Sequence, residues 1–595
     1  MKNLIKNNIN LVRDKMAKAQ IAACILPTAD PHLSEYLVDH WKTREWCSGF
    51  TGSAGTLVIT QNEAGLWTDS RYFTQASYQL EGTSILLHKE GLPATPSIQE
   101  FITSKVRPND KVGADLQLFS IQHINTLTST FKKSGITLVH FDPAQAWEDR
   151  PALPLQPISL FDEPFRGKET KQKLIEIREQ MKLKECDTLI TTSLEDIAWT
   201  LNLRGEDLRC TPVFFSHLII GLSEVSLFVD SKKLKPEVAS YLKDIRVKLF
   251  PYEEFTLALT QLDPAKILVD PKTTSYQYLS YLPNKIQIVF ANSPIPLLKS
   301  IKNSNEIQSI QRAMQKDGVA MVRFLMWLEE KIEKKEFPTE LDIVNQLYFL
   351  RKQQQNFKTV SFETIAGYKE NGAIVHYTPT EESSKRISPN SFLLVDSGAQ
   401  YLDGTTDLTR TIALGALTEE EKRDYTLVLK GHIALANAKF PAGTRGSQLD
   451  VLARLPLWNE GLNFLHGTGH GVGHYLNVHE GPQSIRMNEN PITMEVGMLT
   501  SNEPGIYKEG KHGVRIENLM LVAPYKQGLF GPYYQFETVT LCPICTKGIK
   551  TELMSSEEIS WLNKYHEKVY KQLEPLLATP TEKAWLKEAT KKINV

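Results

Sequence analysis

Three aspartates in one short stretch constrain the fold of this chain more than any other feature. The stretch VDSGAQYLDGTTDLTRT follows the apolar run FLLV and contains Asp396, Asp403 and Asp407. Asp403 and Gly404 form a turn dipeptide, which predicts a hairpin with Asp403 facing water and the other two aspartates on its arms. A buried carboxylate is costly unless its charge is compensated, and two carboxylates placed together repel each other. The pair therefore indicates either a cation between the two side chains or a structural role.

A glycine-rich run of histidines favours the cation. The segment LHGTGHGVGHYLNVHEGP contains His466, His470, His474 and His479. Its glycines disfavour a helix and allow the imidazoles to crowd around a small cavity. A dinucleotide-binding fingerprint is excluded, because no glycine occupies the sixth position of that motif. Histidines this close together indicate a functional cluster rather than isolated core residues.

Two glutamates further along the chain add to the charge. Glu503 precedes the tight turn Pro504-Gly505 at a predicted strand end, and Glu517 lies in an alternating strand on the same face as Arg515. With the two aspartates they would carry a charge of about −4, which two divalent cations would neutralise. Oxygen ligands with one imidazole suit Mn²⁺ better than a thiolate-bound zinc ion. Two such ions would lower the pKa of a water between them and supply a hydroxide for hydrolysis.

The composition is that of a globular protein with more than one domain. The chain has 595 residues, of which 41% are hydrophobic and 23% charged, and its formal net charge is −1. This balance provides no general basic field for nucleic acid. We expect a cytoplasmic protein without membrane contact, because the N-terminus lacks the apolar core of a signal peptide and no stretch reaches the length of a membrane span. The CxxC pair Cys542 and Cys545 has no second Cys or His pair nearby. We interpret it as two small apolar residues flanking a strand end at Pro543 rather than as a zinc or redox site.

The order of strand-like and helical segments predicts three blocks. In the first, residues 56–60 and 64–69 are expected to be paired strands, and the proline-rich segment 148–158 a linker. The second block echoes the first, with AWTLNLRG in the place of EWCSGFTG, which suggests a duplicated α/β unit. We place the domain boundaries at residues 1–155, 156–300 and 301–595.

Helix-capping residues mark the third block. Asn305 and Thr339 are expected to cap its first two helices, and Ser555 or Ser556 the C-terminal one. The apolar stripe of that last helix indicates core packing or a dimer face.

These motifs resemble those of the pita-bread metallopeptidases, a family that includes methionine aminopeptidase, prolidase and aminopeptidase P. The resemblance is most specific to the long, three-domain cytosolic form of aminopeptidase P, and it spans almost the whole chain. It rests on the segments SGFTGSAGTLVIT, EDIAWTLNLRGEDLRCTPVFFSHLII, TIAGYKENGAIVHYTP, VDSGAQYLDGTTDLTRT, HGTGHGVGHYLNVHEGP and EPGIYKEGKHGVRIEN. It implies an α/β (α+β) fold, with two related N-terminal α/β domains followed by a C-terminal pita-bread catalytic domain.

The resemblance also implies the metal ligands. By this comparison Asp396 and Asp407 would hold one ion of a manganese pair. His470 and Glu503 would hold the other, while Asp407 and Glu517 would bridge the two.

Further residues match positions near the metals. The histidines of the family that bind no metal correspond to His376, His466 and His479, which would position the substrate and stabilise the oxyanion or the leaving amine. Arg515 is a further candidate for the catalytic site, because it shares a strand face with Glu517. The remaining histidines of this block are expected at the surface or, for His474, in a half-exposed loop: His432, His474 and His512.

By the same resemblance, the enzyme removes the N-terminal residue from peptides with proline at the second position, and it forms a homodimer. Proline offers no N–H and has a fixed φ, so its peptide bond needs a dedicated site. Three alternatives stand beside this one. A methionine aminopeptidase does not need two upstream domains, and the histidine motif and long C-terminal region argue against a prolidase. A non-catalytic peptide-binding module is expected to have lost metal ligands.

Overall fold

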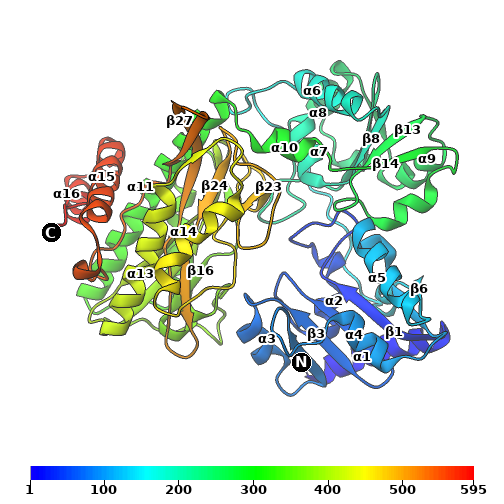
Figure 1. Ribbon diagram of the computed structural model, residues 1–595, viewed down its shortest axis with the longest axis horizontal. Coiled ribbons are helices and arrows are strands. Elements are labelled where there is room, and N and C mark those ends of the chain that lie inside the picture. Colours follow the sequence, from blue (N-terminus) through cyan, green and yellow to red (C-terminus); the bar gives the residue numbers. More distant parts are fainter. Residues whose placement is uncertain (1, 595) are drawn as a thin grey trace. The chain divides into compact units, whose positions relative to one another are not determined.

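The computed structural model describes residues 2–594, which form two compact units (Figure 1). Unit 1 comprises Met1–Phe161 and Lys168–Ile295, and unit 2 comprises Asp162–Gly167 and Pro296–Val595. Among the described residues, no helix combines the length and the apolar character that crossing a membrane requires.

Unit 1 contains two six-stranded sheets. The first has the order β4-β3-β2-β1-β5-β6 and is built from β1 (Ile21–Pro27), β2 (Thr56–Thr60), β3 (Ala64–Thr68), β4 (Ile85–Lys89), β5 (Lys111–Ala114) and β6 (Thr137–His140). The second has the order β12-β11-β10-β8-β13-β14 and is built from β8 (Thr188–Thr191), β10 (Ser216–Gly221), β11 (Val225–Val229), β12 (Val247–Phe250), β13 (Lys266–Val269) and β14 (Gln287–Phe290). A short antiparallel pair joins β7 (Ser159–Leu160) and β9 (Leu203–Arg204).

The two sheets repeat one topology. In the first, β1 pairs antiparallel with β2 and parallel with β5. In the second, β8 pairs antiparallel with β10 and parallel with β13. The outer pairs β3–β4 and β5–β6 are parallel, as are β11–β12 and β13–β14. The repeat agrees with the duplication that the sequence suggests, and β2 and β3 are the paired strands predicted there.

Helices cover the sheets of unit 1. They are α1 (Lys2–Lys18), α2 (Thr43–Ser48), α3 (Phe73–Leu80), α4 (Ile98–Lys105), α5 (Ile121–Lys133), α6 (Thr170–Leu183), α7 (Leu194–Leu201), α8 (Pro236–Asp244), α9 (Phe255–Thr260) and α10 (Ile295–Ser300), the last of which crosses into unit 2. α1 shows why they form: its apolar residues recur at helical spacing and share a core with Cys24 and Leu26 of β1. Ala23 and Ile25, on the opposite face of β1, belong to a second core. The first sheet is therefore buried on both faces.

Unit 2 combines several sheets with long helices. Its helices are α11 (Ser304–Glu333), α12 (Glu340–Lys352), α13 (Glu419–Ala436), α14 (Gly446–Trp458), α15 (Ser556–Leu573) and α16 (Pro580–Ala589). Its smaller sheets contain β15 (Phe357–Val360), β16 (Ile365–Tyr368), β17 (Phe392–Ser397), β18 (Ala399–Tyr401), β19 (Gly404–Thr405), β20 (Leu408–Ala413), β25 (Gly505–Lys508) and β26 (His512–Arg515). A six-stranded sheet contains β21 (Lys439–Pro441), β22 (Gly469–Gly471), β23 (Glu480–Ile485), β24 (Leu499–Asn502), β27 (Asn518–Gly528) and β28 (Gly531–Thr538).

The caps of the long helices follow the sequence with one exception. Thr339 and Ser555 each form a capping box, with Asp342 and Glu558, as predicted. The prediction of Asn305 for α11 was wrong, because the helix begins two residues earlier. Asn303 accepts from the Asn305 and Glu306 amides and completes the box with the Glu306 side chain.

Helices α11, α13 and α15 share one hydrophobic core with the strands of unit 2 (Figure 1). The apolar stripe of α15 is buried in this core, and its buried members are Ile559, Leu562, Tyr565, Val569 and Leu573. Of the two interpretations offered for that stripe, core packing is therefore correct. A dimer face has to be sought elsewhere.

Candidate metal centre

The predicted hairpin places the two aspartates side by side. β17 and β20 pair antiparallel, and Asp396 lies opposite Thr409 in the register. Asp407 directly precedes β20, so both carboxylates lie at the same end of this pair. Asp396 is 7% exposed and Asp407 4%. Both carboxylates are therefore removed from water and need compensation from within the protein or from a bound ion.

The expectation that Asp403 faces water was wrong. This side chain is 2% exposed and accepts hydrogen bonds from Arg312 (3.2 Å), Asn356 (3.0 Å) and Lys316. Burial acts to raise the pKa of Asp403, but Lys316, Asn356 and Arg312 outweigh it and lower that pKa. The turn is covered by α11, which supplies both cations, and nothing in the hairpin sequence indicates that contact.

Four of the five predicted ligands converge at one point. The ligand atoms of Asp407, His470 and Glu517 all lie within 4.8 Å of one another. His470 Nε2 lies 3.5 Å from Asp407 Oδ2 and 3.4 Å from Glu503 Oε1. The segments that carry them are far apart in sequence, so the folded sheets bring together the donors that the sequence could only group by chemistry.

β24 and β27 position both glutamates. Asn502 and Asn518 form the last pair in their antiparallel register, and Glu503 and Glu517 are the next residues along the chain beyond that pair. The Thr409 hydroxyl donates to Glu517 Oε2 (2.8 Å), and the Glu517 amide donates to the Thr409 carbonyl (3.1 Å). The hairpin and the six-stranded sheet are thus joined at the site itself.

Arg515 brings the fifth predicted ligand to the site. Its Nη2 and Nε donate to Asp396 Oδ2, at 2.6 and 3.0 Å, and its Nε also lies 3.2 Å from the Thr409 hydroxyl. The other carboxylate oxygen, Asp396 Oδ1, is buried and has no hydrogen-bond partner among the described residues. Because a buried acceptor is rarely left unpaired, this oxygen is available to a bound cation.

The carboxylates raise one another's affinity for protons. Burial, followed by Asp396 and Glu503, raises the pKa of Asp407 well above its usual range. Burial, followed by Asp407 and Asp396, does the same for the pKa of Glu517. Burial raises the pKa of Glu503 to about 7, although Arg515 opposes this change. Acidic groups that hold protons in this way are stabilised when a cation replaces those protons.

The residues present therefore fit a pair of divalent ions. Carboxylate oxygens with one imidazole are suitable ligands for Mn²⁺. Asp407, His470 and Glu517 bring ligand atoms close together. Asp396, whose charge acts on Asp407 and Glu517, adds an unpaired buried oxygen.

Tyr507, which the sequence motifs did not single out, connects Arg515 to His466. Tyr507 Oη accepts from Arg515 Nη1 (2.7 Å), because a guanidinium can only donate, and it lies 2.8 Å from His466 Nε2. The tyrosine proton is then directed to Nε2, which assigns the His466 proton to Nδ1, where it donates to the Gly467 carbonyl (2.7 Å). Arg515 thus contacts Asp396, Tyr507 and the carbonyl beside His376. The predicted single strand through Arg515 and Glu517 was wrong, because β26 ends at Arg515 and Glu517 lies between β26 and β27.

The other two predicted catalytic histidines lie near the same residues. The rings of His479 and His470 meet edge to face, with their centroids 4.5 Å apart. His376 is half-buried and follows Val375, whose carbonyl accepts from Arg515 Nη2 (3.3 Å). The structure therefore brings the segments of all predicted site residues together.

Three histidines expected near the surface are buried instead. His474, His432 and His512 are each no more than 3% exposed. His474 Nε2 lies 3.0 Å from the Asp403 carbonyl, and His512 Nε2 lies 3.0 Å from Asp424 Oδ2. Isolated histidines carry no periodic signal, so their burial depends on which helix the fold places over them.

Two other features of the chain do not form a comparable site. Cys542 is fully buried and burial raises the pKa of its thiol, while Cys545 is half-buried. Within residues 2–594, neither cysteine belongs to a group with metal-binding geometry.

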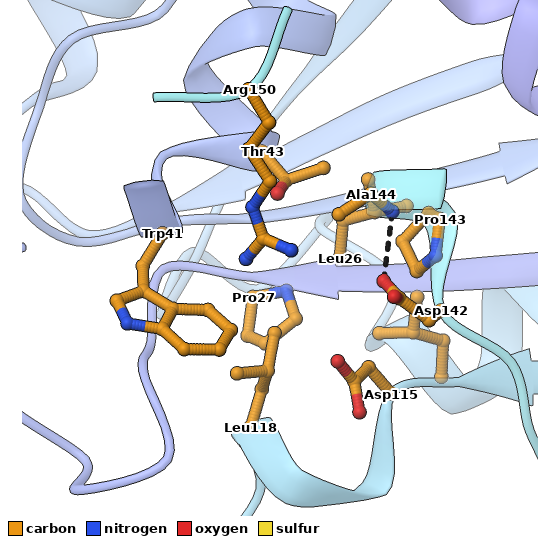
Figure 2. A pocket seen from close by; sticks show the side chains of 11 residues that line it. Leu26, Pro27, Trp41, Thr43, Asp115, Leu118, Asp142, Pro143, Ala144 and Arg150 are labelled. Carbon is orange, nitrogen blue, oxygen red and sulfur yellow. Dashed lines mark hydrogen bonds between the residues drawn. The ribbon is translucent and has the colours of Figure 1, made fainter. Parts of the chain in front are cut away.

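In unit 1, a cavity of about 10 Å³ lies between Arg150, Trp41, Asp115 and Asp142 (Figure 2). It has room for about one water molecule and not for a peptide.

Family models match consecutive parts of the chain. The creatinase/prolidase N-terminal domain matches residues 9–148 and, in a second version, residues 149–306. Metallopeptidase family M24 matches residues 308–524, and the C-terminal region of peptidase M24 matches residues 532–593.

Known relatives are similar over nearly the whole chain. Aminopeptidase P2 of Arabidopsis thaliana is 39% identical across 95% of this chain and 85% of its own length, and Xaa-Pro aminopeptidase 1 of Dictyostelium discoideum is 39% identical across 99% and 96%. The crystal structure of X-prolyl aminopeptidase from Caenorhabditis elegans, described as a cytosolic enzyme with a dinuclear active site, matches with a TM-score of 0.95 and 34% identity across 99% of this chain and 100% of that one. The present chain therefore belongs to the aminopeptidase P group of metallopeptidase family M24, with two creatinase-type N-terminal domains followed by a pita-bread catalytic domain.

Proposed function

We propose that this protein hydrolyses the N-terminal Xaa-Pro bond of peptides with the help of two divalent ions, Mn²⁺ in the cell. The observation that carries the proposal is the convergence of Asp407, His470, Glu503 and Glu517, with the unpaired Oδ1 of Asp396 as the fifth donor. In this proposal Asp396 and Asp407 would hold one ion and His470 and Glu503 the other, while Asp407 and Glu517 would contact both. The names of the relatives supply the substrate class.

The metals and the protein contribute different parts of the reaction. When bound, the ions would activate water for hydrolysis of the scissile bond. His466 acts from a fixed tautomer, since Tyr507 occupies its Nε2. His376 and His479 complete the group that holds the substrate and stabilises the oxyanion. Because the leaving nitrogen of proline has no hydrogen of its own, one of these histidines must deliver a proton as the bond breaks.

The test combines metal analysis with peptide cleavage. The purified protein is expected to bind two Mn²⁺ per chain and to cleave a peptide that begins Xaa-Pro far faster than its Xaa-Ala counterpart. Equal rates on the two peptides would move the assignment toward a general aminopeptidase, and full turnover without metal would exclude the proposal.

We also propose that the protein is a homodimer. The C-terminal stripe no longer supports this, but α14 exposes Val451, Leu455 and Trp458 at positions i, i+4 and i+7, with 40%, 50% and 42% of their surfaces accessible. Such a stripe is typical of a surface that another molecule covers. Sizing by light scattering is expected to give twice the chain mass; a monomer at micromolar concentration would contradict this.

Two further proposals concern the domain boundaries of the chain and its location in the cell. We propose domain boundaries at 155/156 and 300/301, which limited proteolysis in the connecting segments would test. A cytoplasmic location is supported by the description of the Caenorhabditis elegans enzyme as cytosolic. Fractionation of cells that express the full chain would test it.

A further inference from the structure

His432 lies in the middle of α13 and is fully buried. Its ring contacts the last pair of the ladder between β24 and β27. Nδ1 lies 3.1 Å from the Asn502 carbonyl, and Nε2 lies 3.1 Å from Asn518 Nδ2. The backbone carbonyl of His432 also accepts from Asn502 Nδ2 (2.9 Å). One residue of a helix thus bonds both strands at the point where their pairing ends.

The neighbouring Arg410 determines where the protons lie in this contact. Arg410 Nη2 donates to Asn518 Oδ1 (2.9 Å), and a guanidinium cannot accept, so Oδ1 is the acceptor end of the amide. The NH₂ group of Asn518 therefore faces His432 and donates to Nε2. The ring proton must then be on Nδ1, from which it donates to the Asn502 carbonyl. Both ring nitrogens are therefore hydrogen-bonded, Nδ1 as a donor and Nε2 as an acceptor.

This arrangement requires a neutral ring. Burial, followed by the charge of Arg410, lowers the pKa of His432 to about 3. A second ring proton would face the NH₂ group of Asn518. The backbone at Asn502 and Ile516 favours the charged ring but does not outweigh burial and Arg410. Around neutral pH, the contact therefore has a single hydrogen-bonding pattern.

Glu503 and Glu517 are the residues immediately beyond the pair that His432 bonds. The end of a ladder is where paired strands separate most readily. We propose that His432 is a positioning residue, which sets the separation of Glu503 and Glu517 and thereby the affinity of the site for its two metal ions. This inference rests on the proposed function, since it takes both glutamates as metal ligands.

The variant His432→Phe keeps a planar aromatic ring, somewhat larger than imidazole, and removes both of its hydrogen bonds. The measurement is titration of the metal-free full-length protein with Mn²⁺ by calorimetry, together with the electron paramagnetic resonance spectrum of the loaded site. Loss of a residue that orients metal ligands weakens metal binding about 10- to 100-fold. We expect a loss of this size for the weaker-binding ion, and a changed spin coupling between the two ions, because coupling depends on their separation.

His566 provides a matched control. It is also fully buried, its pKa is lowered to about 4 by burial, and its Nε2 accepts from the Ile544 amide (3.1 Å) in the C-terminal region. His566→Phe removes a similar bond in the same unit but contacts neither Asn502 nor Asn518. It is expected to leave Mn²⁺ affinity and the spectrum unchanged.

Two smaller changes separate the two bonds. His432→Asn can keep the donor to Asn502, and His432→Gln can keep the acceptor for Asn518, so each is expected to weaken Mn²⁺ binding less than His432→Phe. If His432→Phe does not fold, these two variants decide the question.

The inference is overturned if the folded His432 variants bind Mn²⁺ as the wild type does, or if His566→Phe weakens binding equally. A wild-type protein that binds no metal pair would instead refute the proposed function.

Discussion

Among single residues, Arg515 has the widest set of contacts across the site. It neutralises Asp396, it donates to the Val375 carbonyl beside His376, and it directs the Tyr507 hydroxyl toward His466. A fully buried guanidinium keeps its charge here because Tyr507, Asp396 and Glu503 raise its pKa, against the effect of burial. The orientation of the histidines thus depends on a cation that contacts only one of the proposed ligands.

Tyr507→Phe tests this chain of contacts. Without the hydroxyl, His466 loses its partner at Nε2 and keeps only the Gly467 carbonyl at Nδ1, while all five proposed metal ligands remain. We expect a fall in kcat of roughly 10- to 100-fold with two metal ions still bound. Steady-state kinetics and metal analysis on the same sample check this; loss of metal would show that Tyr507 acts on the ligands instead.

Asp407→Asn tests the ligand cluster. We expect metal uptake and activity to be lost. Because burial, followed by repulsion from Asp396 and Glu503, raises the pKa of Asp407, the metal-free variant should melt no lower than the metal-free wild type. Calorimetric melting of both proteins after chelation checks the second point.

Asp403→Asn is the matched comparison from the same hairpin. It leaves Lys316 and Arg312 without their carboxylate, so it should lower the melting temperature and leave metal uptake intact. A loss of metal uptake in this variant would mean that the site depends on the hairpin turn as well as on the ligands.

The residues that could be predicted from sequence are those with unusual chemistry in recognisable spacing. The clustered aspartates, glutamates and glycine-flanked histidines carried that signal. Arg515 was selected on a strand alternation with Glu517 that the structure interrupts between β26 and β27. Tyr507 and His432 did not, because their roles arise from what packs against them. An ordinary tyrosine in a strand and a histidine in a helix give no local indication of such a contact.

Among the elements, the C-terminal helix α15 is connected to the site through Arg410. Arg410 on β20 is fully buried and donates to the carbonyls of Glu517 (2.7 Å), Cys542 (2.7 Å) and Pro543 (2.9 Å). Its Nη2 also lies 3.0 Å from the hydroxyl of Tyr565 on α15. One side chain therefore connects the strand of a proposed ligand to the C-terminal region.

Tyr565→Phe removes only that hydroxyl. It leaves several buried polar atoms short of a partner, so we expect the free energy of unfolding to fall by roughly 1–3 kcal/mol. Chemical denaturation followed by circular dichroism measures this. Tyr570→Phe, on the same helix, is the control and should have little effect, because the structure gives its hydroxyl no hydrogen bond among the described residues.

Short-range sequence signals predicted the helices and strands well, but they did not predict what packs against each of them. The paired strands, the hairpin around Asp403-Gly404 and the caps at Thr339 and Ser555 follow from short-range chemistry. The start of α11 was misplaced, since Asn303 and Asn305 are equally good caps by type. The apolar stripe of α15 left two interpretations open. Periodicity shows that one face of a helix is covered, but it does not show whether the same chain or another molecule covers it.

At the scale of the whole molecule, the duplication within unit 1 creates a contact between its two sheets. His32 follows β1, and its Nδ1 lies 2.8 Å from the carbonyl of Thr192, which follows β8. A carbonyl only accepts, so Nε2 must accept from the Tyr252 hydroxyl at 2.8 Å. Burial lowers the pKa of His32 to about 4, and the charge of Lys233 adds to this effect.

This pKa predicts an acid sensitivity. An unfolded chain binds the His32 proton below pH of about 6.5, whereas the folded protein resists it until about pH 4, so stability falls as pH drops through this window. The loss from this residue is roughly 3 kcal/mol at the lower end. Denaturation at several pH values across this window gives the free energy of unfolding, which should change more steeply with pH for the wild type than for His32→Gln. Identical slopes would contradict the assignment.

The number of domains and the class of fold could be predicted from the sequence, since the echo between AWTLNLRG and EWCSGFTG points to a repeated unit. The contact through His32 could not. It joins segments whose proximity is set by the strand order of two separate sheets.

The acidic cluster also bears on how long the protein survives. Ions that bind only the folded chain shift its equilibrium away from the unfolded form, and their removal restores the repulsion among Asp407, Glu503 and Glu517. A cell short of divalent metal would therefore hold this protein in a more easily degraded state. Its abundance would then fall together with its activity.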